Sequence, residues 1–211
     1  MSLERERASP RPPEFFEKLL LTRVPQYRLD LAGPVVGRLA GYLAELDIWR
    51  RRSNLTGRLT PEELVEHALE SALGTSLIPQ NARVVDVGSG AGFPGLPLAI
   101  VRSDLEITLV EPRTKRCAFL RHVVRTLGLS NVRVAQARIE DLGDATFDVA
   151  TTRAVGRFPE WLADARFLEP QGALLAWTTG PDSVGRGFAL ERALRIPGSS
   201  KGRIAAFRRT S

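Results

Sequence analysis

The chain has 211 residues, of which 43% are hydrophobic and 26% are charged, and its formal net charge is +6. This balance allows one substantial hydrophobic core and excludes a disordered or fibrous protein. No apolar stretch is long enough to cross a membrane, and a single cysteine excludes an internal disulfide, so we predict a cytoplasmic protein. His67, Cys117 and His122 are far apart in the sequence, so no metal site is predicted.

The first 80 residues predict a polar tail followed by a helical cap. Residues 1–13 are polar and proline-rich without an apolar period, which is typical of a disordered tail. Apolar residues recur at helical spacing over residues 14–21 and 34–52. A third helix is predicted from Pro61 to about Gly74, because Thr60 is a suitable N-cap residue and acidic residues fill the first turn.

Beyond residue 80, apolar strand-like runs alternate with helical segments. This alternation predicts an α/β domain over residues 81–211, in which a doubly wound sheet binds its ligand at the carboxyl ends of the strands. We predict strands near residues 83–87, 106–110, 131–135, 147–152, 172–178, 191–196 and 203–208, and helices near residues 95–101, 113–127 and 158–167.

Residues 84–95 carry the strongest ligand-binding signal. An apolar strand interrupted by Asp86 runs into three alternating glycines, which permit positive φ and a close approach of the backbone to a ligand. The spacing is G-x-G-x-G, which differs from the G-x-G-x-x-G of dinucleotide-binding proteins. The loop is similar to the first motif of class I S-adenosylmethionine (SAM) methyltransferases.

The second predicted strand ends in an acidic residue, Glu111. A carboxylate at this position can accept hydrogen bonds from both ribose hydroxyls of an adenosyl group. The alternative is an acidic residue that faces the dipole of the following helix. The glycine loop that precedes it in the sequence favours the ribose role.

The ends of the third and fourth strands carry further candidate side chains. After the third strand comes Ala137-Arg138-Ile139-Glu140, where an apolar side chain can cover an adenine face and the local backbone can pair with the edge of the base. Arg153 is expected to project from its strand into the crevice, toward the carboxylate of the cofactor or an incoming phosphate. A solvated loop arginine is the alternative.

The excess positive charge lies in residues 183–211, whereas the preceding residues hold equal numbers of basic and acidic side chains. A cluster of this kind is a candidate phosphate-contacting surface. Arginine outnumbers lysine 27 to 3 over the whole chain, so a compositional bias is the alternative. The basic residues of this segment are Arg186, Arg192, Arg195, Lys201, Arg203, Arg208 and Arg209.

Several short motifs occur in a family-specific order. They are Asn54-Leu55-Thr56, His67 followed by Ser71, DVGSGAGFPGLPLAI at residues 86–100, Lys115-Arg116 followed by Phe119-Leu120, ARIE at 137–140 and TRAV at 152–155. Over roughly residues 40–180 the chain resembles the RsmG/GidB proteins, which are bacterial 16S rRNA guanine-N7 methyltransferases. SAM enzymes in general share the glycine loop but not the Asn-Leu-Thr segment and the histidine that follows it.

The resemblance implies a class I SAM-dependent methyltransferase fold with an N-terminal helical extension, SAM as the cofactor, and a guanine in the 530-loop region of 16S rRNA, within the small ribosomal subunit, as the target. We also expect a monomer. Asn54 as a turn residue and His67 as an ordinary helix-face histidine remain alternatives. With Glu111 included, the expected cofactor-binding residues are Gly88, Gly90, Gly92, Phe93, Glu111, Ile139, Glu140 and Arg153, and the expected catalytic residues are Arg153, His67 and Asn54.

The sequence departs from the family pattern at three places. Glu70 stands where the family usually has aspartate, Thr179-Gly180 replaces the usual Lys-Gly, and the segment 181–191 is short. Two alternatives follow: a catalytically impaired homologue that binds SAM and RNA, and an NAD-dependent oxidoreductase on the same topology.

Overall fold

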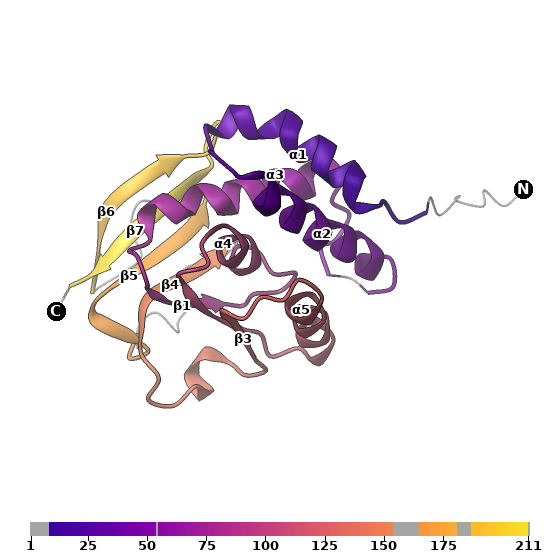
Figure 1. Cartoon of the computed structure of the whole chain (residues 1–211). Coiled ribbons are helices and arrows are strands. Elements are labelled where there is room, and N and C mark those ends of the chain that lie inside the picture. Colours follow the sequence, from indigo (N-terminus) through magenta and orange to yellow (C-terminus); the bar gives the residue numbers. More distant parts are fainter. Residues whose placement is uncertain (1–8, 54, 154–164, 181–186, 211) are drawn as a thin grey trace, which may run out of the picture.

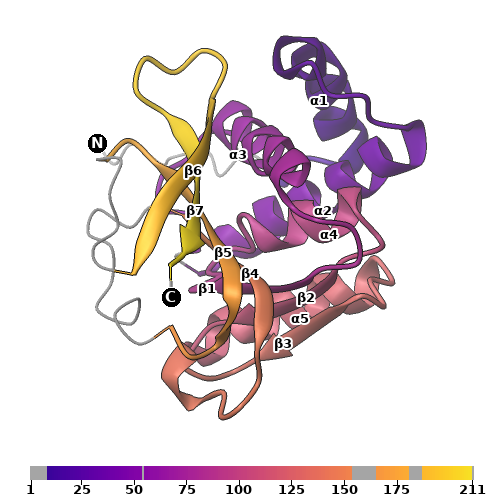
Figure 2. The same cartoon turned by 90° about the vertical axis from the view of Figure 1, so that its left-hand side faces the viewer.

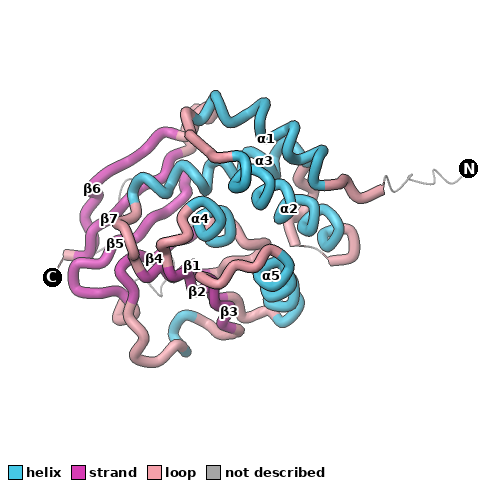
Figure 3. Tube along the Cα trace, in the orientation of Figure 1, coloured by secondary structure: helices cyan, strands magenta, loops and turns pink. Residues whose placement is uncertain are grey.

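The computed structural model describes residues 9–53, 55–153, 165–180 and 187–210. After an all-helical beginning, helices and strands alternate through the middle of the chain, and the last four described elements are strands (Figures 1 and 3). The elements are α1 (Pro13–Tyr27), α2 (Gly33–Arg50), α3 (Pro61–Leu73), η1 (Gly74–Leu77), β1 (Arg83–Val87), α4 (Gly95–Val101), β2 (Glu106–Val110), α5 (Thr114–Thr126), β3 (Val132–Ala135), η2 (Ile139–Asp141), β4 (Phe147–Arg153), β5 (Leu168–Thr178), β6 (Phe188–Arg195) and β7 (Arg203–Arg209).

The described strands form one sheet in the order β3-β2-β1-β4-β5-β7-β6. Strands β1 to β5 are parallel, and β7 and β6 are added in antiparallel orientation. The five parallel strands therefore all end at the same side of the sheet, here called the carboxyl edge. The turn between β6 and β7 lies at this edge too, because Thr178 at the end of β5 pairs with Arg203 at the start of β7.

Two hydrophobic cores lie on the two faces of the sheet. The parallel strands are apolar on both faces, as expected for a sheet covered on both sides. Within β1, Val84 packs in a core that includes side chains of α1 to α5, whereas Val85 packs in a second core on the other face. Helices α1, α2 and α3, here called the cap, lie together over one side of the sheet (Figure 1). The cap and the sheet share the first core.

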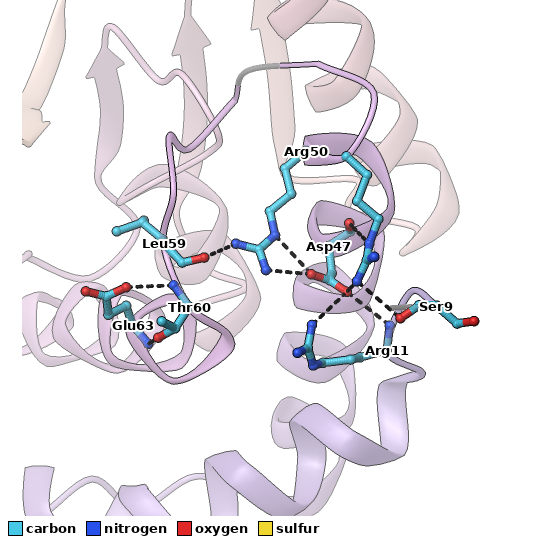
Figure 4. A network of polar contacts seen from close by, with 8 residues as sticks. Ser9, Arg11, Asp47, Arg50, Leu59, Thr60 and Glu63 are labelled. Atoms are coloured by element: carbon cyan, nitrogen blue, oxygen red, sulfur yellow. Dashed lines mark hydrogen bonds and ion pairs between the residues drawn. The ribbon is translucent and has the colours of Figure 1, made fainter. Parts of the chain in front are cut away.

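A polar cluster around Asp47 of α2 ties the N-terminal segment to the cap (Figure 4). The buried carboxylate accepts hydrogen bonds from Arg50 Nε at 2.9 Å, from Arg51 Nη2 at 2.9 Å and from the backbone N–H of Arg11 at 3.0 Å. Burial alone would raise the pKa of Asp47, but these hydrogen bonds lower it below its ordinary value. The carboxylate is therefore held ionised beside three arginines.

The same cluster holds the start of α3. Arg50 also donates to the carbonyl oxygen of Leu59, the residue before the N-cap Thr60. The Thr60 side chain accepts from the Glu63 backbone at 3.2 Å, and the Glu63 carboxylate accepts from the Thr60 backbone at 2.6 Å. This capping box satisfies two of the N–H groups that a helix start leaves unpaired. The helix that carries His67 is therefore fixed at its N-terminal end.

Most of the expected elements are present, but β5 and β6 begin earlier than expected, at Leu168 and Phe188, and three other places differ. Helix α1 continues to Tyr27, because burial of that side chain outweighs the proline at position 25. The helix expected near residues 158–167 falls mostly outside the described residues, and its last three residues form a turn instead, since the Phe167 carbonyl accepts from the Phe147 backbone. Residues 1–8 of the expected tail also lie outside the described residues, whereas the Ser9 carbonyl oxygen accepts a hydrogen bond from Arg51, the C-cap residue of α2. None of the described helices is long and apolar enough to cross a membrane.

Candidate active site

The glycine loop joins β1 to α4 at the carboxyl edge. Gly88, Gly90 and Gly92 have φ angles of 74°, 56° and 101°. A Cβ atom added to the exposed Gly88 would have no described atom within 4 Å, whereas one added to Gly92 would overlap the side chain of Leu96. Gly88 therefore leaves the backbone accessible from outside, and Gly92 allows the loop to pack against α4.

Glu111 follows β2 and reaches back to the glycine loop. Its side chain is almost fully buried. One carboxylate oxygen accepts from the Gly90 backbone at 3.0 Å, and the other accepts from the backbone of Arg113, the N-cap residue of α5, at 3.0 Å. The Arg116 guanidinium lies 3.5 Å from the first oxygen. Since each carboxylate oxygen can accept two hydrogen bonds, Glu111 keeps acceptor capacity beside the loop.

Asp86 links the end of β1 to β4 and α4. Thr151 of β4 donates to one carboxylate oxygen at 2.9 Å, and the Gly95 backbone donates to the other at 3.3 Å. Complete burial raises the pKa of Asp86 to about 6, although both hydrogen bonds act in the opposite direction. The sequence alone does not single out Thr151, because its only signal is a polar residue within an apolar strand.

The residues expected to hold an adenine follow β3, the neighbour of β2. Ile139 is buried in the second core, which also includes Val110 at the end of β2, and the Glu140 side chain is exposed. The Glu111 backbone N–H donates to the carbonyl oxygen of Ala135, the last residue of β3, at 3.1 Å. The ends of β2 and β3 are thereby held together, so Ile139 and Glu140 lie at the same edge of the sheet as Glu111.

Arg153, the last residue of β4, forms an ion pair with Glu70 of α3. Its side chain is only 15% exposed. Nη2 donates to the Glu70 carboxylate, while Nη1 is buried and has no hydrogen-bond partner among the described residues. Trp177, which pairs with Arg153 across β4 and β5, donates its indole N–H to the Glu70 carbonyl oxygen at 2.8 Å. Arg153 is therefore fixed, with one guanidinium nitrogen left for an acceptor.

Three aromatic rings connect the cap to the glycine loop. His67 of α3 contacts Phe93 edge-to-face with ring centroids 5.6 Å apart, and Phe93 contacts Tyr42 of α2 at 5.4 Å. The Tyr42 hydroxyl donates to the carbonyl oxygen of Ala91 in the loop at 2.9 Å. Burial, together with the positive charge of Arg153, lowers the pKa of His67 to about 4, so the imidazole is neutral at pH 7. The expected site residues His67, Phe93 and Arg153 thus lie close together.

The pKa values of His67 and Asp86 give opposite pH dependences of stability. His67 has a folded pKa of about 4, below its ordinary 6.5, so the unfolded chain binds more protons and stability falls as the pH drops through this range. Asp86 has a folded pKa of about 6, above its ordinary 3.8, so the folded chain binds more protons. Its contribution to stability therefore rises as the pH drops through an overlapping range. The two effects largely cancel in the wild type.

We therefore expect single substitutions to reveal each effect. Acidification from about pH 7 to about pH 5 should stabilise His67→Gln by about 1 kcal/mol and destabilise Asp86→Asn by about 2 kcal/mol, each relative to its own value at the higher pH. Urea unfolding at a series of pH values measures both slopes against the wild type. Parallel profiles for all three proteins would contradict the assigned pKa values.

Not all expected site residues are brought together. Asn54 lies outside the described residues, and so does Arg186 of the basic segment. Arg208 pairs with Glu191 at 2.8 Å, and Arg209 donates to backbone carbonyl oxygens ahead of and within β5. The described residues contain no group of three or more side chains suited to a metal ion.

The family model for GidB, described as rRNA small subunit methyltransferase G, matches residues 36–180, which is more than half of the chain. The protein belongs to the GidB family. Two relatives named ribosomal RNA small subunit methyltransferase G support this. The protein of Halorhodospira halophila is 42% identical over 161 residues (75% of this chain and 77% of the relative), and that of Sorangium cellulosum is 40% identical over 173 residues (78% and 71%).

Solved structures identify the fold of this GidB-family chain. Precorrin-6y C5,15-methyltransferase of Geobacter metallireducens has a TM-score of 0.53 at 15% identity, covering 74% of this chain and 92% of that one. TYW2 of M. jannaschii, solved in complex with AdoMet, has a TM-score of 0.51 at 17% identity, covering 69% and 77%. The predicted family and the predicted class I methyltransferase fold are both confirmed.

Proposed function

We propose that this GidB-family protein transfers a methyl group from SAM to N7 of a guanine in 16S rRNA. The observation that carries this proposal is the family match over residues 36–180. It is supported by the site at the carboxyl edge, where Arg153, His67 and Phe93 meet beside an accessible glycine loop. The match to an rRNA methyltransferase family leaves the NAD-dependent oxidoreductase alternative without support.

The residues of the site fit SAM. The open backbone at Gly88 can approach the ligand, and Glu111 keeps acceptor capacity for ribose hydroxyls. Ile139 offers an apolar side chain for the adenine, next to the exposed Glu140. The unpartnered Nη1 of Arg153 suits the carboxylate of the methionine part, because a buried guanidinium nitrogen gains most from a charged acceptor.

The chemistry requires alignment more than proton transfer. SAM supplies an electrophilic methyl group on a positively charged sulfur. Guanine N7 has an in-plane lone pair and no proton to lose, so the chain needs no general base and acts by holding the two reactants in line. His67 and Phe93 provide an aromatic surface for the base. A neutral His67 also avoids repelling the sulfonium, which a protonated imidazole would do.

The position of the target atom restricts the RNA. N7 lies on the major-groove edge of guanine, and the major groove of an RNA helix is too deep and narrow for side chains. The substrate is therefore a loop or a partly assembled part of 16S rRNA. Such a substrate places the protein in the cytoplasm, where ribosomes assemble.

Thr179, the residue after β5, is the position at which the alternative of an impaired enzyme can be tested. Arg203 donates to the carbonyl oxygen of the adjacent Gly180, so a cation already lies beside this position. We expect rapid methyl transfer by the wild type and a change of less than about twofold in Thr179→Lys, since a second cation adds little transition-state stabilisation. Single-turnover methylation of 16S rRNA or small subunits gives the rate, and mass mapping of the product locates the methyl group.

Thr126→Lys, at an exposed position of α5, controls for the added charge. A slow wild type that Thr179→Lys accelerates several-fold, at unchanged SAM affinity, would favour the impaired homologue. A methyl group mapped to a different atom or a different RNA would contradict the proposed function itself.

A further inference from the structure

The turn between β6 and β7 brings positive charge to the carboxyl edge of the sheet. Arg195 is the last residue of β6 and Lys201 lies in the turn; both side chains are exposed. Neither has an ion-pair or hydrogen-bond partner in the described part of the chain. Figure 2 shows this turn projecting beyond the neighbouring strands. The two cations are therefore presented to solvent at the edge that carries the candidate active site.

The strand register gives the position of this turn relative to Arg153. Arg153, Trp177, Ile204 and Leu194 form one row across β4, β5, β7 and β6, and Arg195 follows Leu194. Neighbouring strands are about 4.8 Å apart, so three steps across the sheet separate Arg195 from Arg153 by roughly 15 Å. One strand of a nucleic acid covers this distance in a few nucleotides.

Arg208 of the same hairpin is placed differently. Arg208 is the last residue but one of β7 and pairs with Ala173 in the middle of β5, four residues before Trp177 and toward the opposite edge of the sheet from the active site. Its guanidinium contacts Glu191 at 2.8 Å and the Gln171 carbonyl oxygen at 2.8 Å. Arg208 therefore has intramolecular partners and lies far from the reacting base, although it belongs to the same β6–β7 hairpin as Arg195.

We propose that Arg195 and Lys201 form a docking surface for phosphate groups of 16S rRNA that flank the target nucleotide. This inference rests on the proposed function and adds where the RNA is held. A single target base offers few contacts, and most of the affinity of proteins for nucleic acids comes from phosphates neutralised by lysine and arginine. The surface lies at the correct edge for this role, and it is separate from the residues that meet the base.

The test uses Arg195→Gln, Lys201→Gln and the double variant. The matched control is Arg208→Gln, which removes the same charge from the same hairpin at the opposite edge. Binding to a 16S rRNA fragment that contains the target loop is measured between about 50 and about 200 mM salt. Arg195→Gln and Lys201→Gln should each reduce the slope of log affinity against log salt concentration by about 0.7 to 0.9. Each should also weaken binding several-fold at the lower salt concentration. The control, SAM affinity and the transfer rate at saturating RNA should stay within about twofold of wild type.

The outcomes separate this inference from the proposed function. An unchanged slope in the double variant, or an equal change in Arg208→Gln, overturns the docking surface while leaving the methyltransferase activity intact. A loss seen only with assembled small subunits, and not with naked rRNA, assigns the turn to a ribosomal protein and also overturns it. If the variants change the salt dependence of RNA binding as expected but the wild type does not methylate this RNA, the proposed function fails and the docking surface stands. No binding by the wild type overturns both.

Discussion

Gly88→Val is expected to abolish SAM binding in a protein that still folds. The valine side chain would occupy the space above the loop, where no described atom lies within 4 Å of an added Cβ. Steric overlap and lost backbone contacts together should weaken SAM binding by more than about a hundredfold. Calorimetric titration with SAM measures the effect, and the smaller Gly88→Ala should show an intermediate loss.

Gly128 provides a matched control for backbone strain. It has a φ of 60°, similar to the 74° of Gly88, and an added Cβ there also meets no described atom within 4 Å. Gly128→Val should therefore lose similar stability, about 1 to 3 kcal/mol, because a branched side chain at positive φ is strained. It should keep wild-type SAM affinity. Undiminished SAM binding by a folded Gly88→Val protein would refute the assignment of the loop.

The second large effect is expected at Arg153. Arg153→Gln should lower single-turnover methyl transfer by about a hundredfold to a thousandfold, which is the usual effect of removing one preorganised donor from a reacting site. The guanidinium nitrogen that has no described partner would be lost, and so would the ion pair that holds the cap against β4. Comparing SAM affinity with the transfer rate shows whether Arg153 acts mainly on cofactor binding or on the aligned complex.

Two variants distinguish these roles from simple loss of stability. Arg83→Gln removes an arginine of β1 that pairs with Asp148 and Glu169 at the opposite edge of the sheet, and its activity should stay near wild type. In Arg153→Gln the Glu70 carboxylate is left half-buried without its partner, which costs about 1 to 3 kcal/mol. The double variant with Glu70→Gln should recover that stability but not the activity. If the double variant also recovered activity, the role of Arg153 would be limited to pairing with the Glu70 carboxylate.

The glycine loop and its acidic partner could be predicted because both signals are local. A strand that runs into alternating glycines, and a second strand that ends in Glu111, are visible within a few residues, and the Gly90–Glu111 hydrogen bond places them together. The pairing of Arg153 with Glu70 could not be predicted. These residues are 83 positions apart, and Glu70 differs from other surface acids of its helix only by where the fold puts it.

The positions of the cations in the basic segment also could not be predicted from local signals. Composition located the excess charge in the last 29 residues, but the antiparallel register of β6 and β7 decides which cations reach which edge of the sheet. A register shift between Leu190 and Arg192 offsets the pairing of β6 with β7, and no pattern in the sequence predicts it. Arg195 and Arg208 look equivalent in the sequence and lie at opposite ends of the same hairpin.

The shared core of the cap and the sheet has a consequence for how the molecule unfolds. Leu64 of α3 and Leu175 of β5 are fully buried in one cluster, although the sequence pattern predicts a division near residue 80. Elements that bury the same apolar surface lose their packing together, so we expect the cap and the sheet to unfold as one cooperative unit with a single thermal transition, which calorimetry would show. A fragment starting near residue 81 would keep α4 and α5 but would expose to water the apolar surface that α1, α2 and α3 cover, so we expect it to aggregate instead of behaving as a smaller methyltransferase.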